Sequence, residues 1–168
     1  LLSMHKNQGL YSPEFEHDNC GAGFICSLNG KKTNDIVHKA LNILTCLEHR
    51  GAVSSDGKTG DGAGILIEIP DEFFRKECNF VLPDPKTYAV GMVFLPQKIN
   101  QMQFCIKIFE EEIQKRGLSI IGWRDVPVNA KVVGKIAALS QPAIKQVFIT
   151  YEDKSLSENE FNTQLFVA

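Results

Sequence analysis

Residues 51–64, GAVSSDGKTGDGAG, are so rich in glycine and aspartate that they can continue neither a helix nor a regular strand. The segments on either side are therefore separate elements. Before this loop, apolar residues recur at helical spacing and predict a helix from a cap at Thr33 to about His49. Its apolar stripe consists of Ile36, Ala40, Ile43 and Leu47, widened by Val37, Leu41 and Leu44. After the loop, Ile65–Ile69 predict a strand that Pro70 stops.

The remaining segments predict neighbouring strands and pairs of helices rather than a strict alternation of the two. The other predicted strands are Phe24–Leu28 (buried, ended by the turn Asn29-Gly30), Tyr88–Leu95 (central in its sheet), Leu118–Trp123, and residues near Gln146–Tyr151. Four further helices are predicted: a short one that begins at Asp71, one over Asn100–Arg116, one near Val132–Leu139, and one that starts at Ser157. In the second of these, Phe104, Ile108 and Ile113 are expected to be buried and Gly117 to be the C-terminal cap. In the last, Ser157 and Glu160 form a capping box. This order favours a layered α+β fold over a doubly wound sheet.

The composition is that of one soluble globular domain: 168 residues, of which 43% are hydrophobic and 23% are charged. A net charge of -2 gives no basic patch for nucleic acid. The apolar runs are too short to cross a bilayer, and Leu1-Leu2 is too short for the core of a signal peptide. We therefore expect a cytoplasmic protein with neither a membrane nor a nucleic acid as partner.

The five cysteines differ in their surroundings. Their number is odd, their spacing is irregular and none forms a CxxC pair, so we expect them to be reduced. Cys26, Cys46 and Cys105 lie among apolar residues, where a thiol usually serves as a small buried side chain. Cys20 differs, because polar residues precede it and Gly21 follows it, which leaves its surroundings open.

Two common kinds of site do not fit the sequence. The loop GKTGDGAG, residues 57–64, lacks the order of a phosphate-binding loop, and a strand rather than a helix is expected after it. A metal site from Cys20, His17, His38 and His49 is also disfavoured. His38 and His49 are eleven residues apart on one predicted helix, or about 16 Å. A catalytic pair of Cys20 with His49 is conceivable, but no spacing argues for it.

Cys20 can obtain a base from its own residue. A thiol becomes a nucleophile as a thiolate, and its ordinary pKa is about 8.5. If the chain is cut between Asn19 and Cys20, the new α-amine has a pKa of about 7.7–8.0 and can move protons near neutral pH. Residues 1–19 are then a removable leader, and Gly21 allows a substrate to approach closely. From the residues alone, a structural cysteine stays the commoner alternative.

Several segments together resemble a known family: EHDNCGAGFICSLNG, HRGAVSSDGKTGDGAGILIEIP, YAVGMVFLP and LSIIGWRDVPVN. They resemble the amino-terminal glutaminase domain of glutamate synthase large chains, a class II glutamine amidotransferase, over roughly residues 8–168. The CG at residues 20–21 and the RG at residues 50–51 are common to class II amidotransferases. The longer segments look unlike the amidophosphoribosyltransferase branch.

The resemblance implies an N-terminal nucleophile (Ntn) hydrolase fold: a four-layer αββα sandwich, here incomplete at its C-terminus. It divides the chain into a leader, residues 1–19, and a partial amidotransferase domain, residues 20–168. It implies that Cys20 is the nucleophile that hydrolyses glutamine to glutamate and ammonia. Arg50 and Gly51 match the family's RG pair and would have a supporting role near the nucleophile. A helix C-terminal cation is an equally good interpretation of Arg50.

In the full-length family, downstream domains of the same chain use the ammonia and 2-oxoglutarate for glutamate biosynthesis. This oxidoreductase step implies FMN, an iron–sulfur cluster and, in some members, a small electron-delivering subunit, whereas this chain is expected to hold no cofactor or metal. The family's oxyanion hole lies beyond residue 168, so we expect the isolated chain to be nearly inactive. The alternatives are another class II amidotransferase, such as an amidophosphoribosyltransferase, and a non-catalytic binding domain with a structural Cys20.

Overall fold

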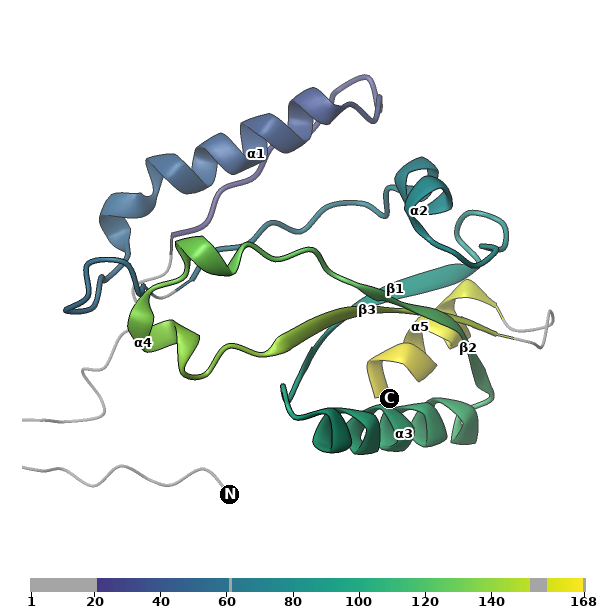
Figure 1. Cartoon of the computed structure of the whole chain (residues 1–168). Helices are drawn as coiled ribbons and strands as arrows, with labels where there is room; N and C mark the ends of the chain where they lie inside the picture. The colour runs from purple at the N-terminus through teal and green to yellow at the C-terminus, as the bar shows by residue number, and fades with distance from the viewer. Residues whose placement is uncertain (1–20, 61, 152–156, 168) are drawn as a thin grey trace, which may run out of the picture. The chain divides into compact units, whose positions relative to one another are not determined.

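The structure, a computed structural model, describes residues 21–60, 62–151 and 157–167 (Figure 1). The chain divides into two compact units, Leu1–Leu66 and Ile67–Ala168. The predicted leader, residues 1–19, and Cys20 lie outside the described residues. Among the helices that the described ranges contain, none is both long and apolar enough to cross a membrane.

The main element of the first unit is helix α1, Asn34–Cys46, followed by a 3-10 turn, Glu48–Arg50. Thr33 occupies the N-cap position with extended backbone, as predicted, but its side chain caps no amide. The α-helix ends before His49 because the chain tightens there: the Leu47 amide is shared between the carbonyls of residues 43 and 44. The predicted stripe is half-buried except for Leu41, which is exposed.

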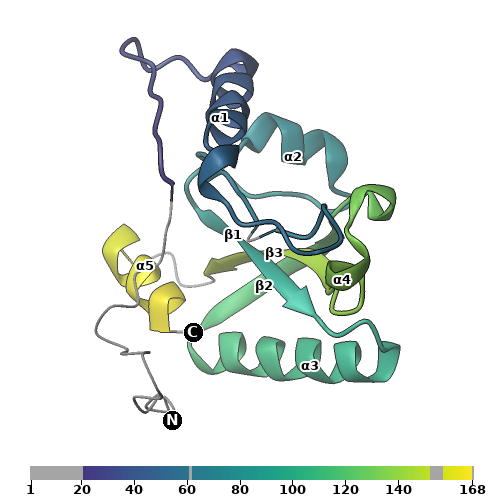
Figure 2. The same cartoon turned by 90° about the vertical axis from the view of Figure 1, so that its left-hand side faces the viewer.

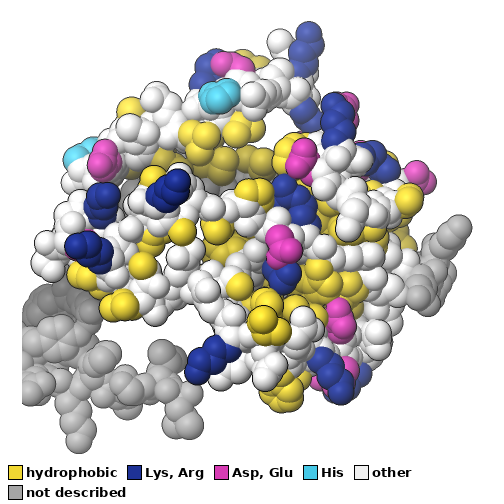
Figure 3. All heavy atoms as spheres, viewed as in Figure 1, with side chains coloured by type: hydrophobic (Ala, Val, Ile, Leu, Met, Phe, Trp, Pro, Cys, Tyr) yellow, Lys and Arg dark blue, Asp and Glu magenta, His cyan; other side chains and the backbone are white. Residues whose placement is uncertain are grey.

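Two predicted strands are wrong. Phe24–Leu28 and Ile65–Ile69 have no regular secondary structure, and Phe24 is 91% exposed. A strand requires a neighbour for its backbone N–H and C=O groups. Outside the named strands, the only bridge among the described residues is Val53–Gly60. Apolar side chains accordingly lie open among charged ones on the face shown in Figure 3.

The glycine- and aspartate-rich segment is a loop, as predicted. Asp56 organises it: one carboxylate oxygen accepts hydrogen bonds from the amides of Lys58 (3.1 Å) and Thr59 (2.8 Å). The other oxygen accepts from the Thr59 hydroxyl at 2.7 Å. Asn29-Gly30 also forms its predicted turn, in which the Gly30 amide donates to Ser27 O at 3.1 Å and Gly30 has a φ of +63°.

The second unit is built on an antiparallel sheet of three strands: β1 (Tyr88–Leu95), β2 (Leu118–Asp125) and β3 (Ala143–Tyr151). Its order is β1-β3-β2, so the prediction of a central β1 is wrong (Figure 2). The central strand is β3, which pairs with both neighbours and carries the fully buried Val147 and Phe148. A central strand needs cover on both faces, and β3 meets this requirement with consecutive apolar residues.

Helices cover both faces of this sheet (Figure 1). Helix α2, Asp71–Glu77, packs Phe74 with Leu82, Tyr88 and Phe148 on one face. Helices α3, Ile99–Lys115, and α5, Glu158–Val167, cover the other face. The core on that side consists of Ile113, Leu118, Val147, Ile149 and Phe161. The described residues therefore have a mixed α/β fold with an antiparallel sheet, which confirms the predicted class.

Helix α3 is confirmed to within one residue at each end, but its predicted buried face is only partly right. Ile113 is 1% exposed, whereas Phe104 is 65% and Ile108 45% exposed. The face turned to the sheet carries Phe109 instead, because its ring packs edge-on against Trp123. Gly117 follows the helix with a φ of +71°, which confirms the predicted cap.

The two remaining predicted helices have different outcomes. At α5 the capping box is confirmed: the Ser157 amide and hydroxyl both donate to Glu160 Oε2, at 2.9 and 2.7 Å. The helix predicted near residues 132–139 is shorter, with a 3-10 turn at Ala130–Val132 and one turn, α4, at Lys135–Ala138. Gly134 separates them with extended backbone.

Candidate active site around the end of helix α1

Gly21, the first described residue, lies against the end of α1. A Cβ placed on Gly21 would be 3.3 Å from Leu47 Cδ2 and 3.4 Å from Arg50 Cδ. The structure thus brings Gly21 and Arg50, two of the predicted site residues, into contact range of each other. The prediction of Cys20 itself lies outside the described residues and stays a prediction.

Gly23 approaches the same helix still more closely. A Cβ placed on it would be 2.6 Å from Ile43 Cγ2, a separation that real Cβ atoms essentially never show. Gly23 does not have the positive φ that favours glycine, so an added methyl group would be opposed by Ile43 and not by the backbone. Sequence reasoning assigned Ile43 only to the apolar stripe. The sequence feature that could have indicated this contact is Gly23 itself, the second glycine after Cys20.

Arg50 and Gly51 end the turn that follows α1. The Arg50 amide donates to Leu47 O at 2.9 Å and the Gly51 amide donates to Glu48 O at 3.1 Å. The Arg50 side chain starts from the C-terminal end of this helical segment and the residue is exposed. Its location therefore fits both interpretations of Arg50, a group near the nucleophile and a cation at a helix C-terminus.

The two histidines that the structure describes have local partners. His49 Nδ1 lies 2.9 Å from Cys46 O, and His38 Nε2 lies 3.2 Å from the side-chain amide of Asn34. No group of three His, Cys, Asp or Glu residues in the described ranges is arranged to hold a metal ion.

Four cysteines are described, and none of them forms a disulfide. Cys26 and Cys46 are exposed, so the prediction that they are buried is wrong. Cys105 and Cys78 are half-buried. Burial raises the pKa of the Cys78 thiol, and the nearby Arg124 opposes that rise. A raised pKa keeps a thiol protonated at neutral pH, which disfavours Cys78 as a nucleophile.

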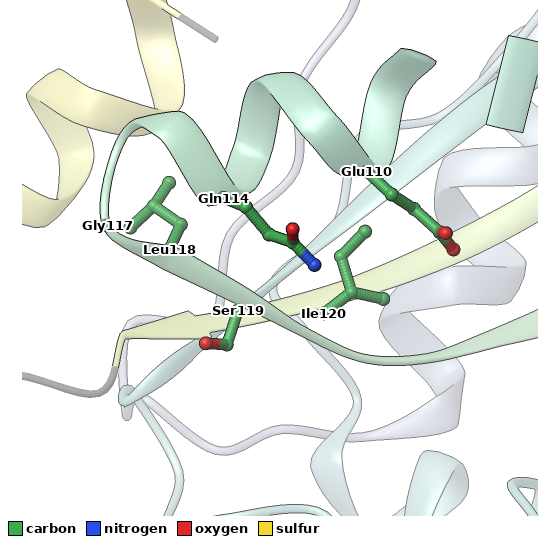
Figure 4. Close-up of a pocket in the computed structure, with 6 residues that line it drawn as sticks. All are labelled: Glu110, Gln114, Gly117, Leu118, Ser119 and Ile120. Carbon is green, nitrogen blue, oxygen red and sulfur yellow. The ribbon is translucent and has the colours of Figure 1, made fainter. Parts of the chain in front are cut away.

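An open pocket of about 570 Å³ lies in the second unit between α3 and β2 (Figure 4). Its lining residues are Glu110, Gln114, Gly117, Leu118, Ser119 and Ile120. It contains no thiol and none of the predicted site residues. The carboxylate of Glu110 is already engaged, because it accepts a hydrogen bond from Trp123 Nε1 at 2.8 Å.

The segment GWRDVP, residues 122–127, proves to be a structural motif. A Cβ on Gly122 would be 2.5 Å from the Phe80 ring, so the glycine lets that ring lie on the strand. Arg124 donates a hydrogen bond to Gln146 at 2.9 Å, pairs with Glu77 at 3.8 Å and has its guanidinium 5.5 Å from the centre of the Phe73 ring. These contacts join α2 to the sheet.

Comparison with known proteins identifies the family. The profile of the family "Glutamine amidotransferases class-II" matches residues 20–168. The large chain of an NADPH-dependent glutamate synthase from Bacillus subtilis is 47% identical over 98% of this chain. The corresponding chain from Azospirillum brasilense is 41% identical over 94%, and an NADH-dependent glutamate synthase from Saccharomyces cerevisiae is 42% identical over 95%.

These relatives are much longer than this chain. The matched region covers 11% of the Bacillus protein, 10% of the Azospirillum protein and 8% of the yeast protein. The family profile, in contrast, covers nearly the whole chain and begins at Cys20. The chain therefore belongs to the class-II glutamine amidotransferases.

Proposed function

We propose that this chain is the glutaminase part of a glutamate synthase, in which Cys20 hydrolyses glutamine. The observation that carries the proposal is that the family profile begins at Cys20, the residue that the chemistry of the sequence selected. Its direct neighbour Gly21 lies beside Arg50, the arginine of the RG pair. The names of the related glutamate synthases differ in naming NADPH, NADH or ferredoxin. We therefore assign none of the three to this chain.

In the proposed reaction the chain is first cut between Asn19 and Cys20. The α-amine of Cys20 takes the thiol proton, directly or through a water molecule, and the sulfur attacks the side-chain amide carbon of glutamine. The tetrahedral intermediate breaks its C–N bond, and the protonated amine supplies the proton with which ammonia leaves. Water, activated by the same amine, then attacks the thioester, which breaks the C–S bond and releases glutamate.

We assign Arg50 and Gly51 a supporting role at this site. The side chain of Arg50 has its Cδ beside Gly21, the residue that follows the nucleophile, and it carries a permanent positive charge. Such a charge favours a thiolate and attracts the carboxylate of glutamine. The exposure of Arg50 leaves its side chain accessible to a ligand.

We further propose the four-layer αββα arrangement of an Ntn hydrolase, with residues 1–19 as leader and 20–168 as part of the catalytic domain. The support comes from Phe24–Leu28 and Ile65–Ile69, which are mostly apolar, have no regular secondary structure and leave several large side chains exposed: Phe24, Leu28, Ile65, Leu66 and Ile67. A second sheet would bury such segments once other strands pair with them. The relatives are about ten times longer than the matched region, so such strands have a source in a longer protein.

The later steps belong to parts of a longer protein. There the ammonia would meet 2-oxoglutarate in a domain with FMN and an iron–sulfur cluster, with a small electron-delivering subunit in some proteins. A cytoplasmic location fits this role.

Two alternatives lead to different expectations. Another class II amidotransferase would carry a different synthase downstream, and relatives that are all named glutamate synthases at 41–47% identity disfavour it. A non-catalytic domain with a structural Cys20 would keep its leader. A family match that begins at Cys20 disfavours this second alternative.

The deciding experiment uses the protein made from the complete gene. We expect its intact mass and amino-terminal sequence to start at Cys20, and we expect Cys20→Ala to abolish glutamine hydrolysis while the folded fraction stays unchanged. A protein that retains residues 1–19 and hydrolyses glutamine at the rate of the trimmed form would contradict the proposal. Equal activity of Cys20→Ala and wild type would contradict it as well.

A further inference from the structure

Of the two glycines at the start of the described chain, Gly23 leaves less room for a side chain, because Ile43 of α1 lies against it. The missing side chain of Gly23 lets the backbone lie on the helix, where a Cβ would be 2.6 Å from Ile43 Cγ2, 3.8 Å from Cδ1 and 3.9 Å from Cβ. Gly21 lies less tightly on Leu47, at 3.3 Å. Leu47 and Ile43, on one face of the helix, therefore lie against Gly21 and Gly23 of the segment that follows the nucleophile.

This support is rigid on the helix side. Ile43 and Leu47 are one turn apart, and the Leu47 amide donates to Ile43 O at 3.0 Å. Ile43 is β-branched, so its Cγ2 has one strongly preferred position in a helix. A flexible side chain could move away from an added methyl group, but this Cγ2 cannot do so without moving the helix.

We propose that Ile43, through Gly23, is a positioning residue for the nucleophile Cys20. This inference rests on the proposed function of Cys20. Residues 21–23 directly follow the nucleophile in the chain, and their backbone lies on α1. An added methyl group on Gly23 would push this backbone away from the helix, and loss of the Ile43 side chain would let it move closer.

The test uses the complete, trimmed protein and three variants. Because a misplacement of about 1 Å can cost about 10²-fold in rate, Gly23→Ala should lower kcat for glutamine hydrolysis by about that factor and leave KM nearly unchanged. Ile43→Ala should lower kcat about tenfold by the opposite displacement, in keeping with the same sensitivity. The double variant Gly23→Ala/Ile43→Ala should have a higher kcat than either single variant, because the new methyl group occupies the vacated space.

Three controls separate positioning from general damage. Gly64→Ala adds the same methyl group where no atom lies within 4 Å, and Ile36→Ala shortens a half-buried residue of the same stripe about two helical turns before Ile43. Both should keep the wild-type kcat. Gly23→Ala/Ile43→Val retains the β-branch, so it should stay as slow as Gly23→Ala.

Labelling gives a readout that a loss of stability would not reproduce. Iodoacetamide reacts with the thiolate and needs no binding site. Because Cys20 keeps its own amine in every variant, the rate at which iodoacetamide labels Cys20, and the pH dependence of that rate, should be the same as in the wild type. A chloroketone analogue of glutamine must bind first, so its labelling rate should fall in parallel with kcat. If Gly23→Ala does not fold, Ile43→Ala and the two double variants still provide the comparison.

The outcomes distinguish this inference from the proposed function. An unchanged kcat in Gly23→Ala and Ile43→Ala, or equal rescue by Ile43→Val and Ile43→Ala, would overturn the positioning role and leave the catalytic role of Cys20 intact. Full activity in Cys20→Ala would overturn both.

Discussion

At the scale of single residues, the buried Tyr88 offers a test that depends on pH. Its hydroxyl donates to Asp71 Oδ1 at 2.8 Å, and burial followed by this hydrogen bond raises its pKa to about 12. The folded state therefore resists loss of the proton more than the unfolded state, whose pKa is about 10. The stabilisation is complete below about pH 10 and is lost between about 10 and 12 as the pH rises.

Absorbance titration of tyrosinate in the folded protein should thus show a step near pH 12, about two units above the ordinary tyrosine pKa. This step should be missing in Tyr88→Phe. If no such step is seen, or if it persists in Tyr88→Phe, the hydrogen bond to Asp71 does not have the effect assigned to it.

Gly122 permits a second test at this scale. Its replacement by alanine places a methyl group 2.5 Å from the Phe80 ring, which has to move. Overpacking of this kind costs about 1–3 kcal/mol in the free energy of unfolding. Urea denaturation of Gly122→Ala should show that loss, and Phe80→Leu in the same chain should recover part of it. No recovery would mean that the ring is not the obstacle.

At the scale of elements, the sequence predicted those parts whose signals are local. The capping box of Ser157 and Glu160, the turn at Asn29-Gly30 and the cap at Gly117 depend on neighbouring residues, and all three are confirmed. The strands Phe24–Leu28 and Ile65–Ile69 depend on partners that no local pattern specifies. The order of β1, β3 and β2 also depends on pairing between distant segments.

The rotation of α3 about its axis leads to a prediction. Phe104 and Ile108 are about one turn apart, but Ile113 lies about 140° around the helix from Ile108, so the three residues cannot share one face. Only Ile113 is buried, and Phe109, about one turn before it, faces the sheet with it and packs against Trp123. Ile113→Ala should cost about 2–5 kcal/mol in the free energy of unfolding, whereas Ile108→Ala should cost well under half of that. Equal losses in chemical denaturation would contradict the observed rotation.

The cap of α5 is a further prediction at this scale. The Ser157 hydroxyl donates to Glu160 Oε2 and accepts from the Glu160 amide, at 2.7 and 3.3 Å. Ser157→Ala removes both contacts and should cost about 1 kcal/mol in the free energy of unfolding, whereas Ser157→Asp should keep most of the stability. A fully stable Ser157→Ala would show that α5 depends on the packing of Phe161 and Leu165 and not on its cap.

At the scale of the whole molecule, the candidate site divides into a part that sequence could predict and a part that it could not. Cys20, Arg50 and Gly51 could be selected as candidates from the types and order of residues, because a nucleophile and a family segment are each recognised from a short stretch of sequence. The contact of Gly23 with Ile43 could not, because it depends on how an extended segment lies on a helix. Sequence periodicity indicates that Ile43 faces inward but not what it faces.

The exposed apolar segments give the last prediction. Phe24 and Leu66 are almost fully exposed, and surfaces of this kind usually bind other protein. Residues 1–168 expressed alone should therefore bind a hydrophobic dye strongly, and Phe24→Ser with Leu66→Ser should reduce the fluorescence. In the complete protein, where the proposed second sheet covers both segments, the dye should bind weakly and hydrogen exchange should show their amides protected. Rapid exchange there would mean that the two segments stay unpaired, and the four-layer proposal would fail while the chemistry of Cys20 would not.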